Sequence, residues 1–222
     1  MKILDNLKLK LPFSYMRLLK ATIGDAKTIL DLGCGDGALM ELLSKGEKWQ
    51  ITGIDIYGKD IESAKKRNVY QRLIKGDLLK TISNNNLKSK YDVVFFSQVI
   101  EHVTRNQGEK ILNEIEKLAR KRIIVGTPRG FMEQPHEFLD DNPHQVHKSG
   151  WSIEDFILRG YKVHGVGFML VWSYHGLGRN ANIFRMIIST IISYLMSPIV
   201  YFFPILAAGI IATKEKQKVK NV

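Results

Sequence analysis

The sequence contains one cysteine, Cys34, among its 222 residues, so no disulfide within the chain can stabilise the fold. It also has no internal repeat of the kind that solenoid proteins stack. Residues 1–12 contain no continuous apolar stretch and no small-residue cleavage site, which argues against a secretory signal. These absences predict a cytoplasmic protein that depends on a hydrophobic core, for which a chain of this length is sufficient.

Negative charge is scarce relative to positive charge. The 33 Lys and Arg residues exceed the 22 Asp and Glu residues and leave a formal net charge of +11. Such a chain attracts anions, including nucleic acid and acidic lipid headgroups. The basic residues are scattered, however, and the sequence has no RNA-binding module and no interleaving of aromatic with basic residues. We therefore expect no specific nucleic-acid partner.

Short apolar runs alternate with helical patterns through the first 125 residues. Strands are predicted at Thr28–Leu32, Gln50–Asp55, Val69–Ile74, Tyr91–Ser97 and Arg122–Val125, and helices at Gly37–Lys45, Lys59–Arg67 and Glu109–Arg120. This alternation predicts an α/β domain with a mostly parallel sheet and helices on both faces, in which ligands bind at the carboxyl ends of the strands. We expect this domain to occupy residues 25–222, after an N-terminal helix in residues 1–24.

A glycine-rich turn, GCGDG at residues 33–37, follows the first predicted strand. Its G-x-G-x-G spacing differs from the G-x-G-x-x-G spacing of dinucleotide-binding folds, so a pyrophosphate is not the expected ligand. The carboxylates of Asp31 and Asp36 would repel a phosphate but suit an ammonium or a sulfonium group. Cys34 is interpreted as a packing residue, because the acidic loop would raise the pKa of its thiol.

Carboxylates also end the next two predicted strands. Asp55 stands where an acidic residue typically binds ribose hydroxyls, and its two oxygens can accept from both of them. Asp77 ends the third strand, where an acidic side chain can accept a hydrogen bond from an adenine amine. Each residue has a structural alternative, Asp55 as a helix N-cap and Asp77 as a turn residue. Together with the glycine turn, they describe a ligand with an amino-acid end, a ribose and an adenine.

Four motifs follow one another along these strands: ILDLGCGDG, GIDI, KGDLL and YDVVFFSQVIEHV. The series resembles the class I S-adenosylmethionine-dependent methyltransferases of the small-molecule kind called type 11, over about residues 25–130. The resemblance implies a Rossmann-like sheet of seven strands, methyltransferase activity and S-adenosyl-L-methionine as the cofactor. The residues that it implies for cofactor binding are Asp31, Gly33 and Gly35 at the methionine portion, Asp55 at the ribose, Ile56, Asp77 and the adjacent Leu78 at the adenine, and Ser97 and Gln98 below the sulfonium.

Methyl transfer is a displacement in line with the departing sulfur, for which the protein supplies alignment and excludes water. A general base is needed only where the acceptor atom carries a proton. The candidates are Glu101 and His102, directly after the fourth strand, and His147 in a histidine-containing loop predicted for residues 129–150. For His102, packing at a helix start is an alternative; for His147, a role in holding the loop is the alternative.

The same loop carries His136 and His144, and its segment NPHQVHKSGW is similar to an H-x-S-x-W feature of some type 11 members. His144 and His147 stand three residues apart, which could suit a metal ion. No cysteine or further carboxylate grouping accompanies them at the usual spacing, so no metal is expected.

The residues after the fourth strand bear on the acceptor. Many enzymes that methylate amino groups of adenine or glutamine have an Asn/Asp-Pro-Pro-Tyr/Phe quartet there, whereas this chain has SQVI at residues 97–100. We therefore predict a small or lipid-like acceptor that is methylated at oxygen, nitrogen or carbon. Two alternatives stay open: a membrane-associated sensor or scaffold that keeps the cofactor-binding fold, and a methyltransferase of RNA or protein.

The C-terminal part contains a long apolar segment. Met186–Ala212 has no charged residue and exceeds the ~20 residues that span a bilayer. Pro198 and Pro204 would break a single spanning helix, however. We favour a helix over Ile183–Met196, a loop, and a last strand over Leu206–Thr213.

That last strand is expected to lie antiparallel to a strand over Tyr161–Met169. The insertion before it, residues 171–204, is too apolar to be an ordinary surface element. It could cover the substrate pocket, form a dimer contact or contact the inner face of a membrane through residues 183–204.

Overall fold

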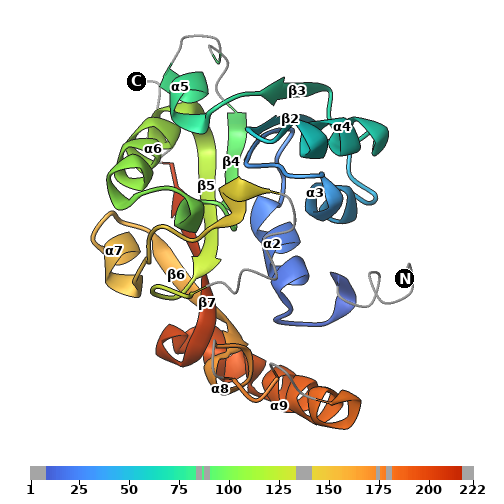
Figure 1. Cartoon of the computed structure of the whole chain (residues 1–222), viewed down its shortest axis with the longest axis vertical. Helices are drawn as coiled ribbons and strands as arrows, with labels where there is room; N and C mark the ends of the chain where they lie inside the picture. Colours follow the sequence, from blue (N-terminus) through green and yellow to red (C-terminus); the bar gives the residue numbers. More distant parts are fainter. Residues whose placement is uncertain are drawn as a thin grey trace.

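The computed structural model describes residues 9–83, 87, 91–133, 142–173, 176–178 and 182–216. Its centre is a seven-stranded sheet in the order β3-β2-β1-β4-β5-β7-β6 (Figure 1). The strands are β1 (Thr28–Leu32), β2 (Gln50–Asp55), β3 (Arg72–Lys75), β4 (Tyr91–Ser97), β5 (Ala119–Pro128), β6 (Lys162–Phe168) and β7 (Ala207–Glu215). Strands β1 to β5 pair in parallel, and β7 is antiparallel to β5 and β6. This sheet confirms the predicted fold class.

Helices pack on both faces of the sheet. The α-helices that the structure describes in full are α2 (Tyr15–Ile23), α3 (Ala38–Leu43), α4 (Gly58–Lys66), α5 (Leu78–Ser83), α6 (Arg105–Leu118), α7 (Ile153–Ile157), α8 (Met169–Trp172) and α9 (Ile183–Phe202), and the short 3-10 helices are η2 (Ile100–His102), η4 (Pro143–Gln145) and η5 (Pro204–Leu206). One hydrophobic cluster joins the sheet to α2 and α3, and a second joins it to α5, α6 and α7.

Strand β4 shows why its sequence is almost entirely apolar. Val93 and Phe95 belong to the cluster under α2 and α3, whereas Val94 and Phe96 belong to the cluster under α5 and α6. Successive side chains of a strand point to opposite faces, so a central strand covered on both sides has no position for a polar residue in its middle. Strand β4 thus lies in the interior, paired with β1 on one side and β5 on the other, and it ends with Ser97 at the carboxyl edge of the sheet.

One helix begins earlier than predicted, and another was not predicted. The helix expected from Glu109 begins at Arg105, because Thr104 and Gln107 form a capping box that satisfies its first N–H groups. The helix α5 was not expected; it starts after Asp77, whose carboxylate accepts a hydrogen bond of 2.9 Å from the N–H of Lys80. In both cases a capping side chain, rather than hydrophobic periodicity, decides where the helix begins.

The apolar insertion also departs from expectation in its length. The helix predicted to end at Met196 continues to Phe202, with Pro198 inside it. A proline lacks the N–H that would bond the carbonyl of Tyr194, and the Ser197 hydroxyl donates to that carbonyl instead, at 2.6 Å. The last strand follows as β7 and pairs with β6, so the preferred assignment of helix and strand is confirmed.

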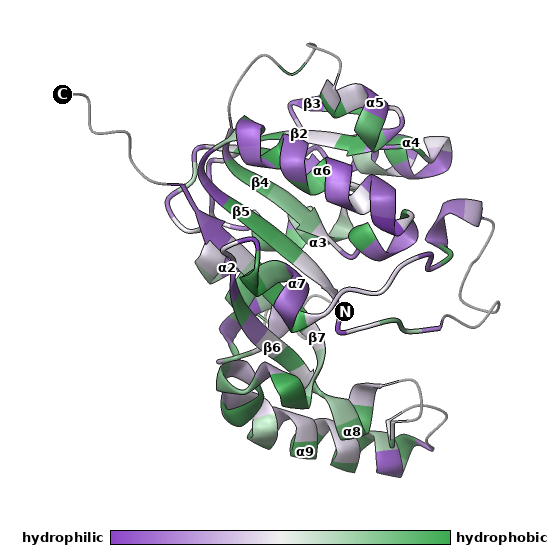
Figure 2. Cartoon of the chain, turned by 90° about the vertical axis from the view of Figure 1, so that its left-hand side faces the viewer, coloured by the Kyte–Doolittle hydropathy of each residue, from purple (hydrophilic) through white to green (hydrophobic). Residues whose placement is uncertain are grey.

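Helix α9 lies along the edge strand β6 at one end of the molecule, together with α8 (Figure 2). By length and composition, this helix could cross a membrane. It connects β6 and α8 to β7, and the two strands pair in one sheet. Both ends of the helix therefore return to the same domain.

Candidate active site

A cavity of about 170 Å³ lies at the carboxyl ends of the parallel strands. Its wall includes seven of the residues predicted to bind the cofactor: Gly33, Gly35, Asp55, Ile56, Asp77, Leu78 and Gln98. The other side is formed by the segment that leads to β6, including Asn142, His144 and Lys148. The sheet and the histidine-containing segment thus enclose one site, as ligands of open α/β sheets require.

The glycine turn approaches its neighbours too closely for a side chain. Gly33 has a φ of +68°, and a Cβ there would lie 2.4 Å from a methyl group of Val99. The N–H groups of Gly33 and Cys34 donate to the carbonyl of Ile54, which ties the turn to the end of β2. Position 33 requires glycine, because both its positive φ and the closeness of Val99 exclude a residue with a side chain.

Asp55 is held rigidly in the cavity wall. One carboxylate oxygen accepts from the N–H of Gly35 and the other from the N–H of Tyr57, both at 2.8 Å. Each oxygen has two lone pairs, so both can accept a further bond from a ligand. The residue joins the glycine turn to the start of α4 and presents a fixed pair of acceptors to the cavity.

Asp31 and Ser97, two further predicted cofactor residues, lie behind this wall. Asp31 is buried and accepts a 2.7 Å hydrogen bond from the hydroxyl of Tyr70. Ser97 is also buried, and its hydroxyl forms a 2.6 Å hydrogen bond with the hydroxyl of Tyr15, a residue of α2. Their contact with a cofactor stays a prediction, because neither residue lines the cavity.

Burial, with a smaller contribution from the negative charge of Asp55 and against the hydrogen bond from Tyr70, raises the pKa of Asp31 to about 7. The folded state thus keeps a proton that the unfolded chain releases near pH 4. The stability that protonated Asp31 contributes is fully present below about pH 4 and is lost as the pH rises through about 7.

We therefore expect the wild-type protein to lose free energy of unfolding between pH 4 and pH 7, with a slope of up to about 1.4 kcal/mol per pH unit from this group. Asp31→Asn should flatten that slope. Urea unfolding of both proteins at pH 5 and pH 8 measures the difference. Equal pH dependence in the two proteins would contradict the burial of a protonated carboxyl group.

The structure brings the three predicted catalytic residues together. Glu101 and His102 belong to η2, and the ring of His147 lies edge-to-face with that of His102 at 4.9 Å between centroids. Of the three, His102 lines the cavity. Burial, with the nearby His147, lowers the pKa of His102 to about 4, so its imidazole is neutral at pH 7.

Glu101 is 2% exposed, and burial raises its pKa to about 7. One carboxylate oxygen accepts from the Thr127 hydroxyl at 3.0 Å. Its backbone carbonyl accepts from the N–H groups of Lys148 and Ser149. Glu101 thereby anchors the histidine-containing segment to η2. His144 also lines the cavity, and His136 lies outside the residues that the structure describes.

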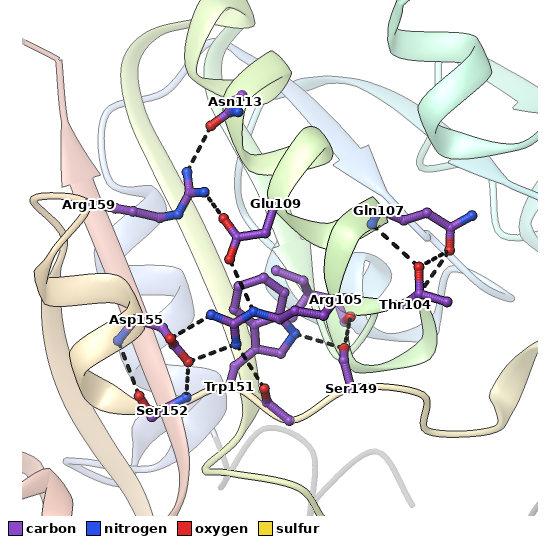
Figure 3. A network of polar contacts seen from close by, with 12 residues as sticks. Thr104, Arg105, Gln107, Glu109, Asn113, Ser149, Trp151, Ser152, Asp155 and Arg159 are labelled. Atoms are coloured by element: carbon purple, nitrogen blue, oxygen red, sulfur yellow. Dashed lines mark hydrogen bonds and ion pairs between the residues drawn. The ribbon is translucent and has the colours of Figure 1, made fainter.

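A polar network around Trp151 fixes the end of that segment (Figure 3). The indole N–H donates to the Ser149 hydroxyl at 3.0 Å, and the Arg105 guanidinium lies 3.9 Å above the ring. Arg105 also forms ion pairs with Glu109 and Asp155. This network gives the H-x-S-x-W spacing a structural reason, because Ser149 and Trp151, two and four residues after His147, are hydrogen-bonded to each other.

Sequence patterns missed several residues of the site. Tyr15 contacts Ser97 and the side chain of Gln98, and Asn142, which lines the cavity, donates to the Asp60 carboxylate. No local sequence signal marks Tyr15 or Asn142, since their roles depend on contacts between segments distant in the chain.

The fold and the cavity define a Rossmann-like domain whose glycine turn and strand-end carboxylates suit an adenosine-containing ligand. Residues 23–160 match the family model described as a methyltransferase domain. The chain therefore belongs to this family of methyltransferases, and the predictions of a class I methyltransferase and of S-adenosyl-L-methionine as its cofactor are confirmed at the level of family and fold.

Two curated relatives are ubiquinone biosynthesis O-methyltransferases. The protein from Rickettsia bellii is 32% identical over 97 residues, which cover 44% of this chain and 40% of that protein. The protein from Serratia proteamaculans is 30% identical over 79 residues, covering 35% and 32% of the two chains. The chain thus matches less than half the length of each of these relatives.

Solved structures show the same fold. A methyltransferase from Archaeoglobus fulgidus, dependent on S-adenosylmethionine, aligns over 95% of this chain and 98% of its own, with a TM-score of 0.57 and 18% identity. The magnesium protoporphyrin IX methyltransferase of Synechocystis PCC 6803, solved with bound S-adenosylmethionine, aligns over 92% and 79%, with a TM-score of 0.53 and 15% identity. At such identities the likeness concerns the fold alone.

Proposed function

We propose that this protein transfers a methyl group from S-adenosylmethionine to a hydroxyl oxygen of a small, lipid-like acceptor at a membrane surface. The observation that carries the lipid part of this proposal is the orientation of α9. The curated relatives support the oxygen part, since their names describe O-methylation in ubiquinone biosynthesis. The proposed cofactor contacts are those of the cavity wall, above all Asp55 and Asp77.

Two serines of helix α9 face the protein, whereas most of its large apolar side chains are exposed. Its buried residues are Ser189, Ser193 and Val200. The Ser193 hydroxyl accepts from the indole N–H of Trp172 at 2.7 Å, which fixes this face against α8. The exposed large apolar residues of the helix include Ile183, Phe184, Ile187, Ile191, Leu195, Ile199 and Phe202, each at least 46% exposed. A helix at a water interface has the opposite arrangement.

The exposed apolar arc is too wide for one partner helix. At about 100° per residue, the exposed positions cover roughly two thirds of the helix circumference, whereas a helix packing on another contributes a narrower stripe. A lipid surface can cover such an arc together with exposed Leu170 of α8. The net charge of +11 favours a surface with anionic headgroups. We therefore assign this face to the membrane, with the domain at its cytoplasmic side.

At the site, the cofactor supplies the activated methyl group when bound. Asp55 and Asp77 would orient the adenosine, and the His102 side of the cavity would receive the acceptor. As the carbon–oxygen bond forms and the carbon–sulfur bond breaks, the hydroxyl proton must leave. The neutral imidazole of His102 can take that proton, with Glu101 and His147 beside it.

The test uses vesicles of phosphatidylcholine with added phosphatidylglycerol. We expect the wild-type protein to sediment with them, and the double variant Ile191→Glu with Leu195→Glu to bind at least about tenfold more weakly, because two charges would enter the lipid face. The double variant Ser63→Glu with Asn106→Glu is the matched control, since it adds the same two charges at exposed positions of α4 and α6, which lie away from α9 (Figure 1). Equal binding by the wild type and the double variant would rule out this face as the membrane contact.

The acceptor is tested in the same vesicles. We expect labelled methyl groups to pass from S-adenosylmethionine to a prenylated catechol in the vesicles faster than to free catechol, and the double variant to lose this preference. Absence of transfer to either hydroxyl compound, by a protein that binds S-adenosylhomocysteine, would overturn the proposed acceptor class and leave the family assignment intact.

A further inference from the structure

Glu101, His102 and His147 form a compact group of potential metal ligands. One donor atom from each residue lies within 4.8 Å of the donor atoms of the other two. Around a tetrahedral ion bound at about 2.0–2.2 Å, the ligand atoms lie roughly 3.3–3.6 Å from one another. Side-chain movements of about 1 Å, which rotations of these side chains can supply, would therefore bring the group to coordinating distance.

An unsatisfied buried oxygen points independently to a ligand at this place. Among the described residues, the Glu101 Oε1 atom has no hydrogen-bond partner, although the side chain is almost fully buried. The other oxygen, Oε2, is satisfied by Thr127. A buried carboxylate oxygen without a partner is costly, and a bound cation would compensate for it.

The histidines are arranged as metal ligands usually are. The Nδ1 atom of His147 lies 2.5 Å from the carbonyl of Met132, so Nδ1 carries the proton and Nε2 keeps a free lone pair. Such a hydrogen bond to a backbone carbonyl orients the histidines of known metal sites. The Nδ1 atom of His102 is also buried without a partner among the described residues.

We propose that Glu101, His102 and His147 bind a divalent first-row transition cation, with Zn²⁺ as the best-matched ion. Two imidazoles and one carboxylate are the protein ligands of catalytic zinc sites, which keep a further position open. His102 lines the cavity, so the open position would face the space for the acceptor. The sequence did not predict this site because its ligands come from two segments more than 40 residues apart.

A role for the cation in methyl transfer rests on the proposed function, whereas its binding does not. An acceptor hydroxyl bound at the open position would have a lowered pKa, because a Lewis acid stabilises the oxyanion. His102 would then be a ligand, and the hydroxyl proton would leave to water. The cation would also fix the acceptor oxygen relative to the sulfonium.

The binding is tested on the full-length protein after removal of metal with a chelator. We expect titration calorimetry to show one Zn²⁺ per chain, and Co²⁺ to give the visible absorption of a low-coordinate nitrogen and oxygen site. His147→Ala and Glu101→Gln should each weaken Zn²⁺ binding at least about tenfold. His144→Ala is the matched control, because this exposed histidine lines the same cavity but is not one of the three ligands. The Zn²⁺ affinity of this variant should stay within about twofold of wild type.

Thermal unfolding in the absence of metal shows whether each variant is folded. If His147→Ala does not fold, Glu101→Gln, which preserves the shape of the side chain, still tests the proposal. The proposal is overturned if the folded wild type binds no Zn²⁺ or Mn²⁺, or if His147→Ala and Glu101→Gln bind Zn²⁺ as tightly as wild type. Titration of the metal-free protein with S-adenosylhomocysteine separates this result from the proposed function, since the proposed cofactor contacts, Asp55 and Asp77, are not among the metal ligands.

Discussion

Replacing Asp55 by alanine is expected to weaken the binding of S-adenosylhomocysteine by about 30- to 1000-fold. The carboxylate would lose two hydrogen bonds to ribose hydroxyls, and bonds to a charged acceptor contribute about 1.5–3 kcal/mol each, with partial compensation by water. The same change removes the bonds that hold Gly35 and Tyr57, so the glycine turn would also lose its support. Titration calorimetry measures the effect directly.

The matched control for this experiment is Asp36→Asn. Asp36 lies in the same turn, but its carboxylate forms an ion pair with Arg67 outside the cavity wall. We expect its affinity to stay within a fewfold of wild type, because a half-exposed ion pair contributes about 1 kcal/mol or less. A comparable loss in both variants would mean that the turn is merely distorted, and would count against a direct contact between Asp55 and the ribose.

Replacing Trp151 by alanine is expected to lower the free energy of unfolding by about 3–5 kcal/mol. The side chain is fully buried and packs on Phe156, with ring centroids 5.8 Å apart. Its ring also occupies the space beside Gly108 in the first turn of α6, where a Cβ would lie 2.4 Å from it. The substitution would leave a large cavity and take the cation–π partner from Arg105.

Urea unfolding of Trp151→Ala and Trp151→Phe distinguishes the two contributions of this residue. The phenylalanine variant keeps much of the apolar contact but loses the N–H that bonds Ser149, so we expect a loss roughly half as large (Figure 3). A loss below about 1 kcal/mol for the alanine variant would show that the network of Figure 3 does not stabilise the fold.

Several features of the site were predictable because they have local causes. Gly33 and Asp55 are recognisable from their positions at strand ends, and the cavity wall contains both. The pairing of Glu101 with His147 was not predictable, since it depends on how the segment after β5 folds back onto η2. Asp31, equally conspicuous in the sequence, faces Tyr70 in the interior, because side chains of β1 alternate between faces.

The sequence alone determined the class of fold, the positions of its central strands along the chain and the place of the cofactor turn. Apolar runs that must be buried on both faces, and a glycine turn directly after the first of them, are local properties that no distant contact can alter. Only the tertiary structure decided which polar residues reach the cavity, and that the serines of α9, rather than its isoleucines, face the domain. Those outcomes depend on contacts between segments far apart in the chain, which the local pattern does not contain.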